Sequence, residues 1–255
     1  MVGAGGMLGQ EIEADATFTR AQLDVTDRDA VRVALSADDL VINCAAWTDV
    51  DGAEEHEDDA MRVNRDGARN VAEAAGAVLY VSSDYVFDGT KREPYLPSDP
   101  VNPLSAYGRT KLAGERATAE ANPRHWIARS SWLFGTGGSN FVETILRLAS
   151  EQDTLRVVDD QIGKPTFTSH LGAALTELAR GDDYGIHHVA GGGQCSWFEF
   201  AREILIRSGS DTRVEPCTSE EFARPAPRPA NSVLGGGSEL PPWQDGLDAY
   251  LGARV

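Results

Sequence analysis

Tyr107 and Lys111 are the residues whose types and spacing point most directly to chemistry. Side chains four positions apart share one face of a helix, so a phenol and an ammonium group can meet there. A neighbouring ammonium group favours the ionised phenol, which lowers the pKa of the tyrosine and makes it a usable proton donor near neutral pH. The chain holds only three lysines against twenty arginines, and lysine supplies a compact charge whose pKa can shift. The alternative is that Tyr107 and Lys111 are an ordinary exposed pair on a helix. The surrounding sequence decides between this interpretation and a chemical role.

A glycine-rich turn opens the chain. Residues 3–9 give the spacing G-x-x-G-x-x-G. Where such a turn joins a strand to a helix, its backbone can approach a pyrophosphate at the helix N-terminus. We therefore expect a dinucleotide cofactor beside Gly3, Gly6, Met7 and Leu8.

Arg20 indicates which dinucleotide is bound. It follows the next short predicted strand, where an NAD-specific enzyme usually carries an acidic residue for the ribose 2′-hydroxyl. An arginine there can accommodate the 2′-phosphate of NADP. Asp24 and Val25, slightly further on, are expected to border the adenine. The sequence therefore favours NADPH and leaves NADH possible.

Ser83 ends a continuous apolar run, at the carboxyl edge where open α/β sheets bind their ligands. A serine there can also be an ordinary strand-end cap. Because Tyr107 follows 24 residues later, and Lys111 four residues after that, Ser83 becomes a candidate to hydrogen-bond the same substrate oxygen. The three residues in this order are a stronger signal than any one of them.

Strands and helices alternate along the first part of the chain. Continuous apolar strands between helices predict a parallel sheet covered on both faces, which is a Rossmann-type, doubly wound α/β fold. The strands are expected at residues 17–19, 40–44, 77–83 and 125–129, and the helices at residues 10–14, 29–35, 58–76 and 105–120.

The pattern changes near residue 150, where the pieces become shorter and proline-rich, as at residues 220–231. We expect an NAD(P)-binding domain over residues 1–149 and a smaller, mainly substrate-binding region over residues 150–255, with some segments returning to the main domain. Only Met1 and Val2 precede the glycine turn, so the first strand is expected to be truncated, through a late start or a trimmed chain. The first helix is expected to be short as well.

Composition narrows the class of protein. The net charge of −17 comes from acidic residues scattered in short groups, which suits a solvated surface in a salt-rich cytoplasm. No basic stripe supports nucleic-acid binding, and no apolar run approaches the length of a membrane span. The three cysteines show neither disulfide nor metal-ligand spacing, which fits a reducing compartment. We expect a cytoplasmic protein without a required metal.

Motifs along almost the whole chain resemble those of extended short-chain dehydrogenases/reductases, and more narrowly the dTDP-4-dehydrorhamnose reductase family. The Asp-Gln-x-Gly-x-Pro-Thr and Arg-Pro-x-Asn-Ser segments separate this family from the broader superfamily. The matching stretches are Gly3–Gly9, Asn43–Asp51, Val63-Asn64, Ser82–Phe87, Tyr107–Glu115, Arg129–Trp132, Asn140-Phe141, Asp160–Thr166 and Arg228–Ser232.

The resemblance implies a reaction and roles for its residues. The family reduces dTDP-4-dehydrorhamnose to dTDP-L-rhamnose by hydride transfer from NADPH. Tyr107 would protonate the sugar C4 oxygen, and Lys111 would bind the nicotinamide ribose and keep Tyr107 acidic. Ser83, where the family commonly has threonine, would hydrogen-bond the same oxygen.

Further residues acquire binding roles from the same resemblance. Ala45, Ala46 and Trp47 would line the cofactor, and Asn64 would brace the active-site backbone. On the substrate side, the resemblance implies that the nucleotide-sugar is contacted by Asp84, Trp132, Arg228 and Asn231. Arg228 suits a diphosphate because its guanidinium is a bidentate fork. For Trp132, core packing is an equal alternative.

Two other functions stay open. One is a non-catalytic nucleotide-binding regulatory subunit, such as the beta subunit of methionine adenosyltransferase, although the intact Ser83, Tyr107 and Lys111 set favours chemistry. The other is a nucleotide-sugar dehydratase or epimerase. A dehydratase would carry an acid-glutamate pair after Ser83, whereas here Asp84 is followed by Tyr85. A homodimer is possible, and Glu11 lies where some family members are described as placing a bridging Mg²⁺ ligand.

Overall fold

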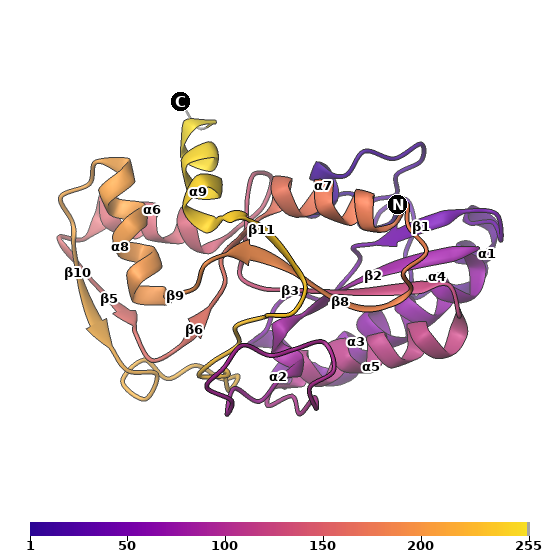
Figure 1. The fold of residues 1–255 in the computed structure, drawn as a ribbon, viewed down its shortest axis with the longest axis horizontal. Coiled ribbons are helices and arrows are strands. Elements are labelled where there is room, and N and C mark those ends of the chain that lie inside the picture. Colours follow the sequence, from indigo (N-terminus) through magenta and orange to yellow (C-terminus); the bar gives the residue numbers. More distant parts are fainter. Residues whose placement is uncertain (254–255) are drawn as a thin grey trace.

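The structure, a computed structural model, describes residues 1–253 and is built around a five-stranded parallel sheet (Figure 1). Every neighbouring pair of strands is parallel. The expected α/β fold is confirmed, and the strands predicted at residues 40–44, 77–83 and 125–129 all form. The order across the sheet is β1 (Leu40–Asn43), β2 (Ala77–Ser83), β3 (His125–Ser130), β8 (Gly185–Gly192) and β11 (Ser238–Pro242).

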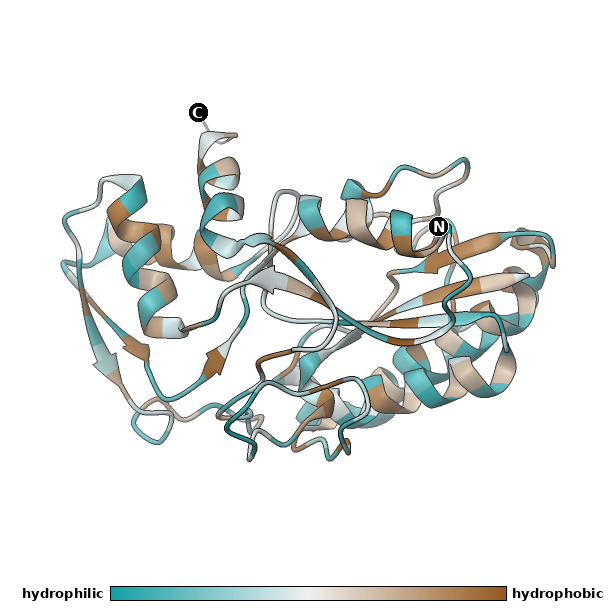
Figure 2. Ribbon diagram, in the orientation of Figure 1, coloured by the Kyte–Doolittle hydropathy of each residue, from teal (hydrophilic) through white to brown (hydrophobic). Residues whose placement is uncertain are grey.

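Helices cover both faces of this sheet. α4 (Ala68–Ala74) and α5 (Ala106–Ala121) lie on one face, and α7 (Thr168–Leu178) lies on the other (Figure 1). Double cover explains why β2 is an uninterrupted apolar run, and Figure 2 shows apolar residues along the central strands between helices of mixed character. Within residues 1–253, no helix is long and apolar enough to span a membrane.

The helix predicted over residues 58–76 is assembled from three pieces. α3 (Glu57–Met61) runs into a π-helical turn, η2 (Arg62–Gly67), and then into α4. Such π turns are rare and often occur at functional sites. This one turns Asn64 fully inward, with no exposed surface. Before it come α1 (Arg28–Ala34), close to the predicted helix at 29–35, and the short α2 (Gly52–Glu55).

The N-terminus contributes a single residue to the sheet. Val2 forms parallel bridges to Phe18 on one side and Asn43 on the other. The expected truncated first strand is therefore this one bridging residue, and the strand predicted at residues 17–19 is reduced to Phe18.

The helix predicted over residues 10–14 is wrong. Only a 3₁₀ turn, η1 (Gly9–Glu11), forms there. The chain has to return to the sheet at Phe18, which leaves no room for a longer helix. A Cβ atom on Gly9 would lie 2.3 Å from the carbonyl oxygen of Gly3, so this glycine allows the turn to pack directly against the glycine-rich loop.

The chain beyond residue 130 builds a second core while returning α7, β8 and β11 to the main sheet (Figure 1). Phe134, Phe200, Ile204 and Leu247 are completely buried in this core. Its elements are β4 (Leu133–Phe134), α6 (Phe141–Glu151), β5 (Thr154–Val158), β6 (Ile162–Gly163), β7 (Thr166–Phe167), β9 (Cys195–Ser196), α8 (Trp197–Ser208), β10 (Arg213–Cys217) and α9 (Trp243–Gly252). A further 3₁₀ turn, η3 (Asp84–Val86), follows β2.

A buried ion pair joins α5 to the sheet. Two nitrogens of Arg129 on β3 donate to the two carboxylate oxygens of Glu115 on α5, at 2.8 and 2.7 Å. The hydroxyl of Ser82 on β2 donates to the same carboxylate at 2.5 Å. Both charged side chains are at most 5% exposed. Burial of two charges requires this near-complete set of partners, because an unpaired charge in the interior is costly.

We expect Glu115→Gln to destabilise the protein by about 3 kcal/mol, because it leaves the Arg129 charge buried without its counterion. The measurement is the free energy of unfolding from urea titration. Glu177→Gln is the matched control, since it breaks an exposed ion pair with Arg180 and should cost about 0.5 kcal/mol or less. Equal losses in the two variants would contradict the anchoring role of Glu115.

Candidate active site

A cavity of about 430 Å³ lies at the carboxyl end of the sheet, against the glycine-rich turn. Its walls include most of the residues predicted to bind the cofactor: Gly3, Gly6, Arg20, Asp24, Val25, Ala45, Ala46 and Trp47. Seven further residues line the cavity and were not predicted to do so. Each adjoins or lies close to a predicted residue in the sequence, and that proximity is the signal that could have identified it. They are Gly5, Thr19, Ala21, Leu23, Cys44, Thr48 and Val63.

The backbone of the turn can approach a ligand because Gly3 has no side chain. Gly3 has a φ of +84°, in the region that favours glycine. A Cβ atom there would lie 2.6 Å from the backbone nitrogen of Ala45. The turn and the Ala45 backbone therefore meet at the wall of the cavity, where a dinucleotide pyrophosphate fits the chemistry of the groups present.

Met7 and Leu8 were predicted to lie beside the cofactor, and neither lines the cavity. Leu8 is 7% exposed and belongs to the core with Ile42 and Leu79. The sulfur of Met7 instead lies 3.9 Å from the amide nitrogen of Asn140. Both side chains therefore lie outside the cavity lining, and a contact of Met7 or Leu8 with the cofactor stays a prediction.

Ser83, Tyr107 and Lys111 are brought together at the end of β2. The hydroxyl of Ser83 donates to the Asp84 carboxylate at 3.0 Å and lies near enough to Tyr107 to influence the pKa of that phenol. Ser83 Oγ also accepts the N–H of Tyr85 at 3.1 Å, and the ring of Tyr85 meets that of Tyr107 edge-on at 5.6 Å. Lys111 lies in the layer beneath, where its Nζ donates to the carbonyl oxygen of Val81 at 2.7 Å.

The expectation that Lys111 lowers the pKa of Tyr107 is wrong for this arrangement. Burial raises the pKa of Tyr107, and the nearby hydroxyl of Ser83 only partly opposes this rise. Burial also lowers the pKa of Lys111 to about 7, which weakens its charge near neutral pH. Its ammonium group lies 4.2 Å from the ring centre of Tyr80, rather than beside the Tyr107 hydroxyl.

Asn64 braces the walls of the site through direct hydrogen bonds. Its amide oxygen accepts the N–H of Trp47 at 2.8 Å, and its amide nitrogen donates to the hydroxyl of Thr110 at 2.9 Å. Its backbone oxygen accepts the hydroxyl of Tyr80 at 3.1 Å. Trp47 lines the cavity and Thr110 lies on α5. Asn64 therefore connects the wall of the cavity to the helix that carries Tyr107 and Lys111.

The N-terminus of α5 is held by two capping groups. Ser105 Oγ accepts the N–H of Gly108 at 3.1 Å. Glu54, on α2, accepts the N–H of Ala106 at 2.7 Å. A carboxylate at a helix N-terminus satisfies a free N–H group and complements the helix dipole. These contacts fix the first turn of the helix, in which Tyr107 lies.

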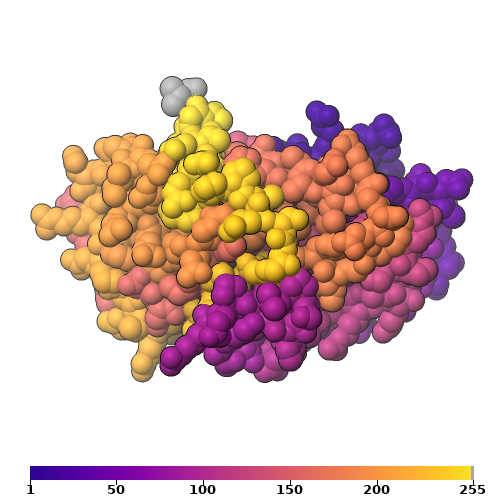
Figure 3. Space-filling model, in the orientation of Figure 1, coloured from indigo at the N-terminus to yellow at the C-terminus, as the bar shows by residue number. Residues whose placement is uncertain are grey.

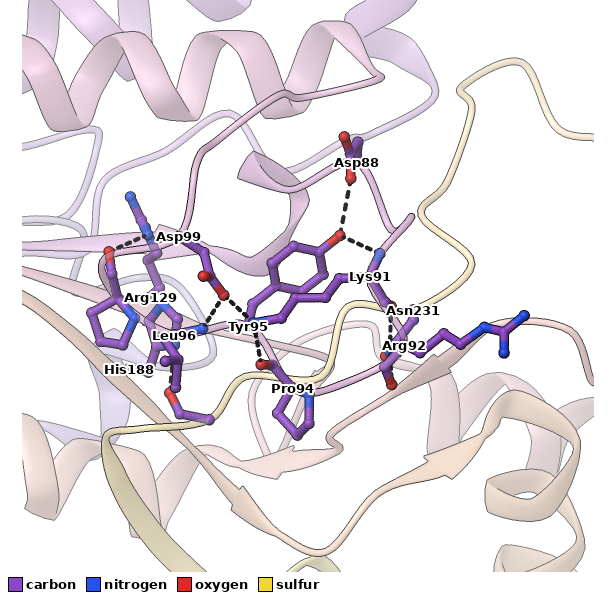
Figure 4. Close-up of polar contacts among 12 residues, drawn as sticks. Asp88, Lys91, Arg92, Pro94, Tyr95, Leu96, Asp99, Arg129, His188 and Asn231 are labelled. Atoms are coloured by element: carbon purple, nitrogen blue, oxygen red, sulfur yellow. Dashed lines mark hydrogen bonds and ion pairs between the residues drawn. The ribbon is translucent and has the colours of Figure 1, made fainter.

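Two residues predicted to contact the nucleotide-sugar are occupied within the protein. Asp84 is 1% exposed, its Oδ1 accepts the hydroxyl of Ser83 at 3.0 Å, and burial raises its pKa to about 6. It is therefore not open to a ligand in this structure, and that prediction is corrected. The amide of Asn231 donates to the backbone oxygens of Lys91 and Arg92 at 2.9 and 3.1 Å (Figure 4), which gives it a structural role.

Trp132 stands at the junction of the two cores. It is the one non-glycine residue among residues 1–253 with positive φ, at +48°. Its ring stacks on Trp197 at 3.5 Å with the planes 6° apart. A Cβ atom on Gly163 would lie 2.3 Å from the ring, so a glycine is required opposite it. Backbone strain of this kind is found most often at functional sites. The ring is half-buried, which is compatible with a substrate contact as well as with core packing.

Comparison with known proteins agrees with this geometry. The family described as RmlD substrate binding domain matches residues 1–253. The chain belongs to the RmlD family. It is 40% identical over 278 residues to a dTDP-4-dehydrorhamnose reductase of Mycolicibacterium smegmatis, covering 100% of this chain and 85% of that protein.

Other RmlD relatives act on different dTDP-sugars. The chain is 39% identical to a dTDP-4-keto-6-deoxy-D-glucose reductase of Streptomyces niveus, over 92% of this chain and 87% of that one. A crystal structure of dTDP-4-dehydrorhamnose reductase from Bacillus anthracis, in complex with NADP, superposes with a TM-score of 0.94 at 36% identity. It covers 99% of this chain and 97% of that chain. The resemblance stated from the sequence motifs is thus confirmed at the level of the family and its fold.

The lowered pKa of Lys111 predicts a pH-dependent stability. Between about pH 7 and its ordinary value of 10.5, the unfolded chain keeps the proton and the folded chain releases it. Raising the pH through this window therefore favours folding. Urea titrations at pH 7 and 9.5 should show wild type gaining at least about 1 kcal/mol relative to Lys111→Met. Lys91→Met, at a partly exposed lysine paired with Asp99, is the control. A constant difference at both pH values would contradict the lowered pKa.

Proposed function

We propose that this protein reduces dTDP-4-dehydrorhamnose to dTDP-L-rhamnose with NADPH. The observation that carries the proposal is the convergence of Ser83, at the end of β2, with Tyr107 and Lys111 on α5. Trp47 connects this group to the cavity at the glycine-rich turn, because it lines the cavity and packs in the same apolar cluster as Tyr107. The RmlD relatives support a 4-keto group of a dTDP-sugar as the target.

The cavity supports NADPH as the cofactor. Gly3 and Gly6 present backbone where the pyrophosphate would lie, and Arg20 offers a cation for the 2′-phosphate. Asp24 lies further along the same wall, where its carboxylate already accepts the N–H and hydroxyl of Thr26. When bound, the reduced nicotinamide supplies a hydride to the carbonyl carbon of the sugar.

Tyr107 is proposed as the proton donor to the carbonyl oxygen. Its raised pKa keeps the phenol protonated at neutral pH, so the proton is available when negative charge develops on the oxygen. The hydroxyl of Ser83 donates to Asp84 in the free protein, and we propose that it turns to donate to the same oxygen and stabilises that charge. Lys111 is proposed to bind the ribose hydroxyls. Burial lowers the pKa of its side-chain nitrogen to about 7.

Tyr107→Phe tests the proposed donor. It removes the hydroxyl and keeps the ring that packs on Tyr85. We expect kcat for NADPH oxidation with dTDP-4-dehydrorhamnose to fall by at least about 10²-fold. Tyr184→Phe, at the opposite end of the sheet where its hydroxyl accepts from Arg124, should leave kcat unchanged. Equal turnover by Tyr107→Phe and wild type would remove Tyr107 from this role, and no turnover by folded wild type would refute the proposed reaction.

Arg20→Ala tests the cofactor. Loss of the guanidinium should raise the KM for NADPH by about tenfold, because a charged contact to the 2′-phosphate is lost, and should leave the KM for NADH almost unchanged. Steady-state kinetics with both cofactors measures this. Arg28→Ala, which removes an exposed partner of Glu73, controls for the loss of a surface charge. A parallel change for NADPH and NADH would show that Arg20 does not read the 2′ position.

A further inference from the structure

Asp51 receives three partners from a single distant segment. Arg224 Nε donates to its carboxylate at 3.0 Å, and Arg228 donates through two nitrogens at 3.1 and 3.0 Å. The N–H of Ala226 donates to it at 3.1 Å. These partners lie 173 to 177 residues away along the chain. We call Asp51, Arg224, Ala226 and Arg228 the Asp51 clasp.

The clasp fixes the stretch from Arg224 to Arg228, whereas Ser219 is held separately by Asp160 and Glu221 by Arg156. Pro225 and Pro227 lack a backbone N–H, so Ala226 supplies the one such donor between the two arginines, and it is given to Asp51. No helix or strand among residues 1–253 includes residues 218–237. A half-buried carboxylate, 18% exposed, thus sets the path of this segment.

The clasp is charged. Burial alone would raise the pKa of Asp51, but hydrogen bonds from Arg228, Ala226 and Arg224 outweigh it and hold the pKa well below its usual range. Arg228 is itself only 17% exposed, so the pair is partly shielded from solvent. Charge-assisted hydrogen bonds of this kind are stronger than those between neutral groups and are weakened less by salt when shielded.

The clasp adjoins the catalytic tyrosine on two sides. The Arg228 guanidinium also lies near enough to the hydroxyl of Tyr85 to lower its pKa in part, and the ring of Tyr85 packs against Tyr107. On the other side, Asp51 immediately precedes α2, whose Glu54 caps α5 at Ala106. The position of the Arg228 guanidinium relative to the Tyr107 hydroxyl is therefore set through Asp51.

The chain after the clasp is held by separate contacts. Leu234 bridges to Tyr95, and Asn231 is tied to the loop at residues 88–99 (Figure 4). Figure 3 shows this loop, in purple, directly against the yellow C-terminal segment. Tyr95 is itself fixed by its hydroxyl, which donates to Asp88 at 2.9 Å. Loss of Asp51 should therefore loosen residues 223–229, between the contacts of Glu221 and Ala230, without unfolding the loop that follows.

We infer that Asp51 is a positioning residue that holds Arg228 over the active site, ready to bind the diphosphate of the nucleotide-sugar. The inference rests on the proposed function for the identity of that substrate. Asp51 takes the end-on pair of Arg228 donors, on Nη1 and Nη2, so the parallel pair on Nε and Nη2 is the one proposed to bind a phosphate. A fixed guanidinium loses less conformational entropy on binding than a free one. Asp51 would thus lower the KM for the sugar nucleotide without touching the reacting atoms.

Asp51→Asn is the primary test, because it removes the charge and keeps the size. We expect the KM for the dTDP-keto-sugar to rise by about tenfold, with kcat and the Kd for NADPH within about threefold of wild type. Asp51→Glu, which restores the charge, should recover part of the loss. An unchanged KM would overturn the inference. A lower KM would also overturn it, since Asp51 would then compete with the diphosphate for Arg228.

Two readouts do not depend on turnover. Chymotrypsin should cleave after Phe222, which is 50% exposed, faster in Asp51→Asn than in wild type, because cleavage requires the flanking segment to open. The affinity for dTDP alone, by calorimetry, should fall by about tenfold, and Asp51→Asn should add little to Arg228→Met. Glu177→Gln is the matched control for loss of an exposed carboxylate.

The outcomes separate the two proposals. Faster cleavage with unchanged dTDP affinity and KM would show that the clasp is purely structural, which overturns the inference. Failure of dTDP to bind wild type would overturn it as well. If wild type binds dTDP, and Asp51→Asn binds it more weakly, but neither turns over the keto-sugar, the proposed reaction is wrong while the positioning role of Asp51 stands.

Discussion

The ion pair between Glu115 and Arg129 is the constraint on which the rest of the site depends. Tyr107, Lys111 and Glu115 follow one another at intervals of four residues, so they share one face of α5. Glu115 fixes that face against β2 and β3 through buried, bidentate contacts. With the helix unable to slide or rotate, its first turn delivers the Tyr107 hydroxyl to Ser83, at the carboxyl end of the sheet.

Burial then decides the chemistry that these groups can perform. Burial raises the pKa of the Tyr107 phenol, which keeps its proton, and lowers the pKa of the Lys111 ammonium group in the layer beneath. The protein as a whole carries a charge of −17, and carboxylates also lie around Ser83, Tyr107 and Lys111. Asp84 and Glu115 are buried beside these residues, and Asp51 and Glu54 lie at the edge of the site.

Local patterns predicted the framework because local physics determines it. Apolar runs became parallel strands, the glycine turn formed a cofactor-sized cavity, and Ser83 met Tyr107. The failures concern side-chain direction and long-range contacts. The side chain of Leu8 packs in the core, and Asp84 is buried near Ser232, which lies 148 residues further along the chain. Asp51 and Arg228 are 177 residues apart in the sequence, and residue spacing does not predict a contact over such a distance.

The central claim is that this site reduces a C4 ketone of a dTDP-sugar, and the fate of a single deuterium tests it most directly. The protein is incubated with dTDP-4-dehydrorhamnose and NADPH carrying deuterium at the transferable C4 position, and the product is examined by NMR. We expect one deuterium at sugar C4. When the reaction is repeated in D₂O, we expect no solvent deuterium at C3 or C5. Absence of deuterium at C4, or solvent exchange at C3 or C5, would contradict the claim and indicate binding without reduction or an epimerase instead.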